Sequence, residues 1–241
     1  MQPYLSVIVP CYNEQKRFKE GFSHYFQYLK RQKYLWELIF VNDGSTDNTL
    51  GLIKLACRKS PRVTFVSYSK NHGKGYAICQ GVKKSNGKQI IFTDIDHSVP
   101  IKTIESFFDY FEKGYVAVIG SRRVKGSKFI KRQPPLREFL GIGFTFLVRL
   151  FIDWQIKDST CGFKAFEGKV AKKIFEKITI YDWAFDAEIL FICKRNNIKY
   201  IQAPVAWEDK RGSKVSPIKD VFNSLLGLIK IRINDLKNQY H

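Results

Sequence analysis

The sequence contains no apolar run long enough to cross a bilayer as a helix, which takes about 20 residues. The longest candidate, residues 139–152, is shorter and carries Arg149. It predicts either a buried helix or a helix that lies in a membrane interface. Residues 4–10 have no basic region before them and are too few for the apolar part of a secretory signal peptide. We therefore expect a cytoplasmic protein.

Cysteine pairs, catalytic histidines and acidic residues are also scarce. The five cysteines are an odd number and form no Cys-x-x-Cys pair, so neither a disulfide framework nor a zinc site is expected. None of the four histidines has a recognisable nucleophile nearby, which gives a hydrolase triad little support. The 41 basic residues outnumber the 22 acidic ones and leave a net charge of +19. Such a surplus attracts nucleic acid, anionic lipid headgroups or phosphorylated substrates.

The 241 residues, 44% of them hydrophobic, suffice for one sizeable α/β domain. Continuous apolar runs, typical of strands buried on both faces of a parallel sheet, alternate with helix-length stretches. The runs occupy residues 5–10, 38–41, 63–66, 90–92 and 116–119. The expected helices lie at about residues 14–31, 47–59, 75–84 and 101–112. This order predicts a doubly wound, mostly parallel sheet flanked by helices, in a single domain over residues 1–241.

Two aspartates follow the apolar run at residues 90–92. In a doubly wound sheet, ligands bind outside the carboxyl ends of the strands, where a turn can bring Asp94 and Asp96 toward one point. Mg²⁺ and Mn²⁺ prefer oxygen ligands, and Mg²⁺ commonly binds one or two carboxylates together with substrate phosphates. Such a site would neutralise charge on a departing diphosphate. An Asp-x-Asp pair alone is far more often a solvated turn, so the position of this pair is what favours a metal site.

Two further loops have alternative interpretations. Asp43 could accept hydrogen bonds from a nucleotide base or ribose, or it could belong to a turn. For residues 45–47 a turn with a helix cap is favoured. The glycine-containing loop at residues 71–75 lacks the spacing of a Walker loop or of Gly-x-Gly-x-x-Gly, and fits a nucleotide contact or a flexible turn equally well.

Basic residues gather between positions 122 and 137, with no acidic residue among them. The apolar segment 139–152 follows, and residues 218–233 place apolar side chains at helical spacing. Nucleic-acid modules usually interleave exposed aromatic residues or show a known motif, so nucleic acid is not expected as a partner. The combination favours amphipathic helices in the C-terminal half that lie on an anionic membrane surface. A solvated loop is the alternative for the basic tract.

Eight motifs together resemble one enzyme family. The segments 7–14, 41–47, 71–75 and 93–100 have the order and spacing of family 2 glycosyltransferases with the GT-A fold. The segments 120–122, 158–166, 183–188 and 212–214 are similar to the polyprenyl-phosphate branch, the dolichyl-phosphate glucose and mannose synthases, and are closer to the glucosyl-type enzymes. Processive relatives carry a Gln-x-x-Arg-Trp motif, and this chain has no Arg-Trp dipeptide.

The resemblance implies roles for individual residues. The positions that match donor contacts are Pro10, Tyr12, Asn13, Glu14, Asp43, Asn71, Lys74, Asp94, Ile95 and Asp96. Among them Asp94 and Asp96 match the pair that binds Mg²⁺ or Mn²⁺ and the diphosphate, with Asp96 as the more direct ligand. The positions that match acceptor-phosphate contacts are Arg122, Arg137, Ser213 and Lys214. By its motif, Asp186 is the best-placed carboxylate for a base or for a contact to a sugar hydroxyl, and a role in capping the core is the alternative. Mannose-synthase relatives have a Gln where this chain has Ser98, which leaves the third metal ligand open.

The implied activity is an inverting hexosyl transfer, glucosyl before mannosyl, from a UDP- or GDP-hexose to a polyprenyl or dolichyl monophosphate. About residues 1–121 would bind the nucleotide sugar, and about residues 122–241 would bind the acceptor and the membrane. The enzyme would be peripheral to the cytoplasmic side of the membrane, alone or with an integral membrane partner. Other possibilities are transfer to a soluble glycan or protein, a nucleotidyltransferase, and a non-catalytic membrane-associated scaffold on the same fold.

Overall fold

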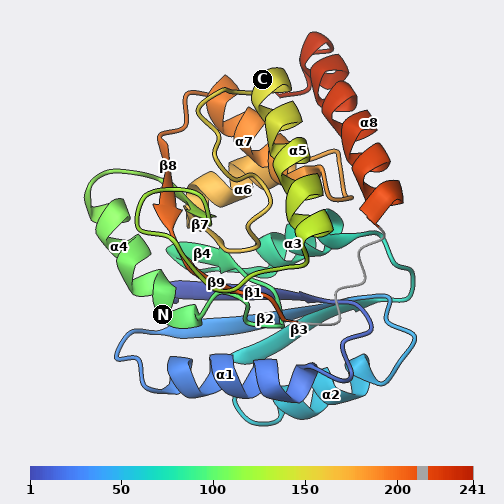
Figure 1. Cartoon of the computed structure of the whole chain (residues 1–241). Helices are drawn as coiled ribbons and strands as arrows, with labels where there is room; N and C mark the ends of the chain where they lie inside the picture. The colour runs from blue at the N-terminus through green and yellow to red at the C-terminus, as the bar shows by residue number, and fades with distance from the viewer. Residues whose placement is uncertain (211–216, 241) are drawn as a thin grey trace.

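The computed structural model describes residues 1–210 and 217–240, except for the side chains of residues 137, 217–222 and 224. Its centre is a seven-stranded sheet with the order β3-β2-β1-β4-β7-β5-β8 (Figure 1). In chain order these strands are β1 (Leu5–Cys11), β2 (Trp36–Asp43), β3 (Val63–Tyr68), β4 (Gln89–Phe92), β5 (Ala117–Ser121), β7 (Lys164–Glu167) and β8 (Tyr200–Pro204). Strand β7 runs antiparallel to β4 and β5, and the other neighbouring pairs of this sheet are parallel. The mostly parallel sheet expected from the sequence is confirmed.

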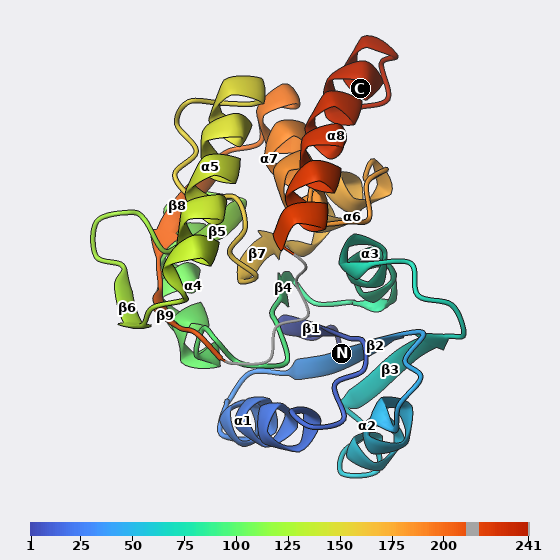
Figure 2. The same ribbon diagram turned by 45° about the vertical axis from the view of Figure 1, so that its right-hand side comes forward.

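Helices cover both faces of the sheet (Figure 2). On one face lie α1 (Phe18–Lys30), α2 (Thr49–Cys57) and α4 (Ile104–Glu112), the last preceded by the 3₁₀ turn η1 (Ile101–Thr103). On the other lie α3 (Lys74–Lys84), α5 (Pro135–Phe151), α6 (Gly168–Glu176), α7 (Phe185–Arg195) and α8 (Pro217–Leu236). Two hydrophobic cores result, one on each side of the sheet.

Strand β1 shows why the apolar runs predicted strands. Leu5, Val7 and Val9 pack in the core that contains α1, whereas Ile8 packs in the core that contains α3. All four side chains are fully buried. A strand covered on both faces needs apolar residues at every position, and its polar neighbours are therefore confined to its ends.

The C-terminal half contains elements that the sequence pattern did not indicate. Besides β7, β8, α6 and α7, these are the short strands β6 (Lys128–Lys131) and β9 (Ala206–Glu208), which form a separate parallel pair. The expected helices at residues 139–152 and 218–233 are present as α5 and α8, which lie side by side in Figures 1 and 2. Within the described residues, no helix combines the length and the apolar character needed to span a membrane.

Helix α8 is held at its middle and near its C-terminal end. A carbon atom added at Gly227 would lie 2.4 Å from the Ala184 side chain, so α8 packs directly against the segment that leads into α7. Farther along, the Tyr240 hydroxyl donates a hydrogen bond to buried Glu188 (2.6 Å), and Asn234 donates one to Thr179 (2.8 Å). These contacts place the beginning of α8 beside the ligand-binding edge of the sheet.

Candidate active site

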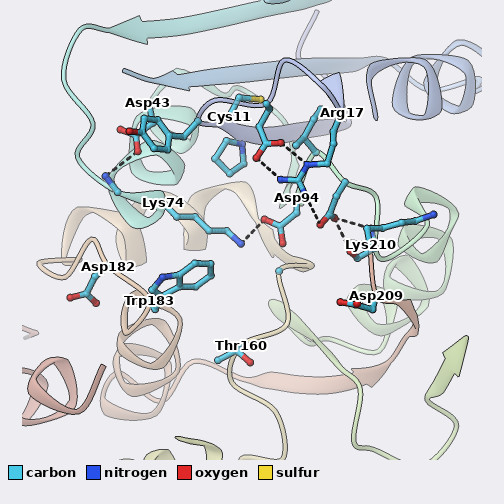
Figure 3. A pocket seen from close by; sticks show the side chains of 18 of the residues that line it. Cys11, Arg17, Asp43, Lys74, Asp94, Thr160, Asp182, Trp183, Asp209 and Lys210 are labelled. Carbon is cyan, nitrogen blue, oxygen red and sulfur yellow. Dashed lines mark hydrogen bonds and ion pairs between the residues drawn. The ribbon is translucent and has the colours of Figure 1, made fainter. Parts of the chain in front are cut away.

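A pocket of about 490 Å³ opens at the carboxyl ends of β1, β2 and β4. Figure 3 shows Asp43 at its upper end, Lys74 and Asp94 in the middle, and Trp183 and Thr160 below them. The lining residues are Pro10, Cys11, Tyr12, Glu14, Arg17, Asp43, Asn71, Gly73, Lys74, Asp94, Ile95, Asp96, Ser98, Arg122, Thr160, Gly162, Asp182, Trp183, Trp207, Asp209, Lys210 and Asn223. Segments from the whole chain thus meet in one cavity.

Asp94 and Asp96 lie in the turn that follows β4, in the middle of this pocket. Asp94 Oδ1 is 2.5 Å from Lys74 Nζ, at the start of α3. Asp96 Oδ1 accepts hydrogen bonds from the backbone N–H and the hydroxyl of Ser98, at 3.0 and 2.8 Å. Its Oδ2 is 3.7 Å from an Arg17 guanidinium nitrogen. Ser98 therefore orients Asp96.

Gly162 fits closely against this carboxylate pair. A Cβ added there would lie only 2.0 Å from Asp94 Oδ2 and 3.2 Å from Lys74 Nζ. The loop before β7 can therefore approach Asp94 only because residue 162 has no side chain. This contact makes the second half of the chain one wall of the carboxylate site.

The electrostatics of the pair suit a divalent cation. Burial raises the pKa of Asp96, and the negative charge of Asp94 raises it further, against the opposing effects of Ser98 and Arg17. A dication would relieve that repulsion. No three His, Cys, Asp or Glu side chains in the described part of the chain form a metal cluster. The donor set fits Mg²⁺ or a similar hard ion that binds two carboxylates and fills its other positions with water and phosphate oxygens.

The upper end of the pocket is built by Asp43 and the loop before α3. Asp43 accepts hydrogen bonds from the backbone N–H groups of His72 (2.8 Å) and Gly73 (3.0 Å) and from the Asn71 side chain (2.8 Å). The carboxylate of Asp43 thus ties residues 71–73 of this loop to the end of β2. Asp43, Asn71 and Gly73 all line the pocket together with Pro10 and Tyr12 from β1 and its following loop.

Asn13 braces the neighbouring loops and is not among the residues that line the pocket. Its backbone is left-handed, with φ of 54°, and its Oδ1 accepts hydrogen bonds from the backbone N–H groups of Thr46 (2.7 Å) and Asp47 (3.3 Å). Asp47 in turn accepts the Thr49 N–H (2.9 Å) where α2 begins. Residues 45–47 thus form the predicted turn before α2, but the N-cap of the helix is Asn48, which makes no side-chain cap hydrogen bond.

Arg122 dominates the opposite side of the pocket. Its guanidinium forms two hydrogen bonds with Asp158, at 2.7 and 2.8 Å, and one with the Thr160 hydroxyl at 2.8 Å, and it lies over the Trp207 ring. Burial alone would raise the pKa of Asp158, but Arg122 and its hydrogen bonds lower it to about 2. Lys210, paired with Glu208 at 3.1 Å, adds a second cation to the lining. This side of the pocket thus combines two cations that are each paired with a carboxylate, the Trp207 ring and the carboxylate of Asp209.

Comparison with known proteins identifies the family. Residues 6–175 match the family described as "Glycosyl transferase family 2". The chain belongs to this family. Among similar curated proteins, the dolichyl-phosphate beta-glucosyltransferases of Dictyostelium discoideum and Homo sapiens are 32% and 33% identical, over 97% and 96% of this chain and 75% and 76% of their own. The resemblance noted in the sequence is therefore confirmed, and the protein is a glycosyltransferase.

Solved structures support the fold of this glycosyltransferase. Glucosyl-3-phosphoglycerate synthase from Mycobacterium tuberculosis, in complex with Mn²⁺, uridine-diphosphate-glucose and phosphoglyceric acid, has a TM-score of 0.70 at 15% identity, over 95% of this chain and 79% of that one. Mannosyl-3-phosphoglycerate synthase from Rubrobacter xylanophilus has a TM-score of 0.67 at 14% identity, over 98% of this chain and 75% of that one. At these identities the likeness shows the fold alone.

Most residues that the sequence singled out meet in the pocket of this glycosyltransferase. Those that line it are Pro10, Tyr12, Glu14, Asp43, Asn71, Lys74, Asp94, Ile95, Asp96 and Arg122. Asp186 is not among the lining residues: it is fully buried on α7 and paired with the equally buried Lys164. Arg137 belongs to α5, but its side chain lies outside the described residues, as do Ser213 and Lys214.

Other lining residues were not predicted. They are Cys11, Arg17, Gly73, Ser98, Thr160, Gly162, Asp182, Trp183, Trp207, Asp209, Lys210 and Asn223. Thr160, Gly162 and Trp183 lie inside motifs that carry the family resemblance, so the signal was present without a role attached to them. Arg17 had no such signal, and it reaches the pocket because Glu14, three residues earlier, holds its guanidinium at 2.7 Å.

Proposed function

We propose that this glycosyltransferase moves a glucosyl group, with inversion, from UDP-glucose to a polyprenyl or dolichyl monophosphate. The observation that carries this proposal is that one cavity contains both a carboxylate pair that could hold a divalent cation beside a diphosphate and, on its other side, the guanidinium of Arg122. Relatives named dolichyl-phosphate beta-glucosyltransferase cover nearly the whole chain and support the acceptor and the sugar. UDP and uridine-diphosphate-glucose occur with Mn²⁺ or Mg²⁺ in structures of the same fold, which favours UDP over GDP and a bound divalent ion here.

In this proposal, different parts of the pocket bind the nucleoside, the diphosphate and the acceptor phosphate. The nucleoside would lie between Tyr12 and Asp43, and the diphosphate beside Asp94, Asp96 and Lys74. An acceptor phosphate near Arg122 is already largely dianionic at pH 7, so it attacks without a strong base. One of its oxygens forms the bond to the anomeric carbon as the bond from that carbon to the diphosphate breaks, and the nucleoside diphosphate departs. An α-linked donor then gives a β-linked product.

A divalent cation held by Asp94 and Asp96 would supply positive charge next to the leaving diphosphate. The protein itself contributes the Lys74 ammonium on the same side, paired with Asp94. Asp186 is not assigned the role of base, because Lys164 occupies its carboxylate inside the core. Positioning of the two phosphorylated substrates therefore carries the rate enhancement in this proposal.

Incubation with UDP-[¹⁴C]glucose, Mn²⁺ and polyprenyl phosphate tests the proposal. We expect the label to enter the organic phase, in a product from which mild acid releases glucose. GDP-[¹⁴C]mannose in a parallel reaction should label the lipid much less. Label on a soluble glycan or protein would contradict the proposed acceptor. An α-linked lipid product would contradict the inverting mechanism. Absence of transfer to any acceptor would favour the hypothesis of a non-catalytic scaffold.

We further propose that α5 and α8 hold the enzyme on the cytoplasmic surface of a membrane, because a long isoprenoid does not leave the bilayer. Exposed apolar side chains occur on α5 at intervals of three and four residues, which places them on one face. They are Leu136, Phe139, Ile142, Phe146 and Leu150. On α8 the exposed apolar residues are Leu226, Ile229, Ile233 and Leu236. Exposed Lys128, Lys131 and Arg132 precede α5 and provide attraction to anionic headgroups.

Replacing Leu136 and Phe139 by serine should weaken liposome binding by at least about a hundredfold. These side chains are 67% and 71% exposed, and burying each in the acyl boundary would contribute about 1.5–3 kcal/mol. Co-sedimentation with liposomes containing phosphatidylserine measures the effect, and added salt should weaken wild-type binding. Leu55→Ser is the matched control, because Leu55 is 54% exposed on α2, across the sheet. Equal binding of all three proteins would contradict the docking face.

A further inference from the structure

Two side chains in the segment before α7 line the pocket and have no role so far; Trp183 lies below Lys74 in Figure 3, and the exposed carboxylate of Asp182 lies at the edge of the pocket and points away from Lys74. Asp182 and Trp183 both line it (Figure 3). Lys74 Nζ lies 5.9 Å from the centre of the Trp183 ring and 2.5 Å from Asp94 Oδ1. Trp183 therefore adjoins the place where the carboxylates and Lys74 would hold the diphosphate. The group attached to the second phosphate of the donor would come next to this ring.

The chemistry of the two side chains matches a hexose. A pyranose has faces that carry C–H bonds, which pack against an aromatic ring, and a rim of hydroxyl groups, which need hydrogen-bond acceptors. Trp183 offers an indole that is 39% exposed. Asp182 offers a carboxylate beside it. Resting on the proposed function, we propose that Asp182 and Trp183 form the subsite that recognises the transferred hexose.

The local structure fixes this pair independently of any ligand. Asp182 Oδ1 accepts the Ala184 backbone N–H at 2.8 Å, and no hydrogen bond within the described part of the chain engages Oδ2. The Tyr181 carbonyl accepts the Gly75 N–H at 3.0 Å, which ties the segment to the start of α3. Gly227 of α8 packs against Ala184 from the other side. The segment that carries both side chains is thus held between α3 and α8, and one Asp182 oxygen accepts no hydrogen bond from the described residues.

Binding of UDP and of UDP-glucose, measured separately by calorimetry with Mn²⁺, tests this assignment without a transfer reaction. In Trp183→Ala the affinity for UDP should stay within about twofold, whereas the affinity for UDP-glucose should fall roughly tenfold. Trp183→Phe keeps an aromatic face and should retain most of the affinity for UDP-glucose. Asp182→Asn should also lower only UDP-glucose binding, by about tenfold, since a hydrogen bond to a charged group is lost. The Oδ1 atom of asparagine can accept the same Ala184 N–H, so this variant should fold normally.

Trp154→Ala is the control, because Trp154 is an exposed indole that does not line the pocket. It should bind both ligands as the wild type does. Equal losses of UDP and UDP-glucose binding in Trp183→Ala would place Trp183 at the diphosphate and overturn the assignment alone. Unchanged donor binding in Trp183→Ala together with a raised KM for polyprenyl phosphate would also overturn the assignment. It would mean that the indole contacts the acceptor. Wild-type protein that binds neither ligand would overturn the proposed donor and this subsite together.

Discussion

Replacing Asp96 by asparagine should lower the rate of glycosyl transfer by roughly a hundredfold to a thousandfold, the usual effect of losing one group that stabilises charge in a transition state. The carboxylate lies in the middle of the pocket, where Ser98 fixes one oxygen and leaves the other toward Arg17. Asparagine keeps the shape and the acceptor atom but removes the charge that a cation would neutralise. Initial rates at saturating donor and acceptor measure the loss.

The same substitution should leave stability unchanged or slightly increased. Burial and Asp94 raise the pKa of Asp96, so its charge opposes folding and its removal relieves repulsion. Thermal unfolding without ligand should therefore show a Tm at or above that of the wild type. Asp109→Asn, an exposed substitution on α4, is the matched control and should change neither rate nor Tm. An Asp96→Asn enzyme with undiminished activity would refute the role of the carboxylate pair.

The sequence predicted the N-terminal half well for a physical reason. Strands β1, β2 and β4 are largely buried, so their apolar runs are nearly continuous, whereas β3, at the edge of the sheet, is mostly half-buried. Polar residues such as Asp43 and Asp94 therefore mark the ligand-binding edge in the amino-acid sequence itself. The ends of the helices in the structure differ from the predicted ends by only a few residues. Helix α3, for example, begins at Lys74 instead of Gly75.

The C-terminal half was less predictable because its stability depends on distant partners. Strand β7 has four residues and contains Lys164, whose ammonium is fully buried against Asp186, 22 positions later. A lysine in a short run argues against a central strand unless its partner is known. The same pair explains why Asp186, which looked like a catalytic carboxylate in its motif, lies in the core.

The walls of the pocket depend in the same way on tertiary packing. Trp183 reaches it because α7 packs beside α8, and Gly162 because its loop lies against Asp94. Neither of these two tertiary contacts produces a periodic pattern in the sequence. Family resemblance pointed to these segments but not to what each side chain touches.

Replacing Arg122 by alanine should destabilise the protein by about 3–5 kcal/mol at pH 7, because Asp158 would remain as a buried charge without its partner. Asp158 is fully buried, and both of its oxygens accept hydrogen bonds from the guanidinium. Urea unfolding measures the change. Arg123→Ala, the adjacent and half-buried arginine, should cost under about 1 kcal/mol and controls for the loss of one positive charge nearby. The double variant Arg122→Ala/Asp158→Asn should recover part of the loss, since it removes the stranded charge.

The pH dependence of this loss gives an independent check. The pKa of Asp158 falls from 3.8 to about 2 on folding, so in the wild type the pair contributes about 2 kcal/mol above pH 4 and loses it as the pH falls toward 2. In Arg122→Ala, burial without the guanidinium raises the pKa of Asp158 instead, and the carboxyl takes up a proton at mildly acidic pH. The difference in unfolding free energy between the two proteins should therefore shrink from pH 7 to pH 4. A difference that is the same at both pH values would mean that packing of Arg122 against Trp207, and not its ion pair, supports this wall of the pocket.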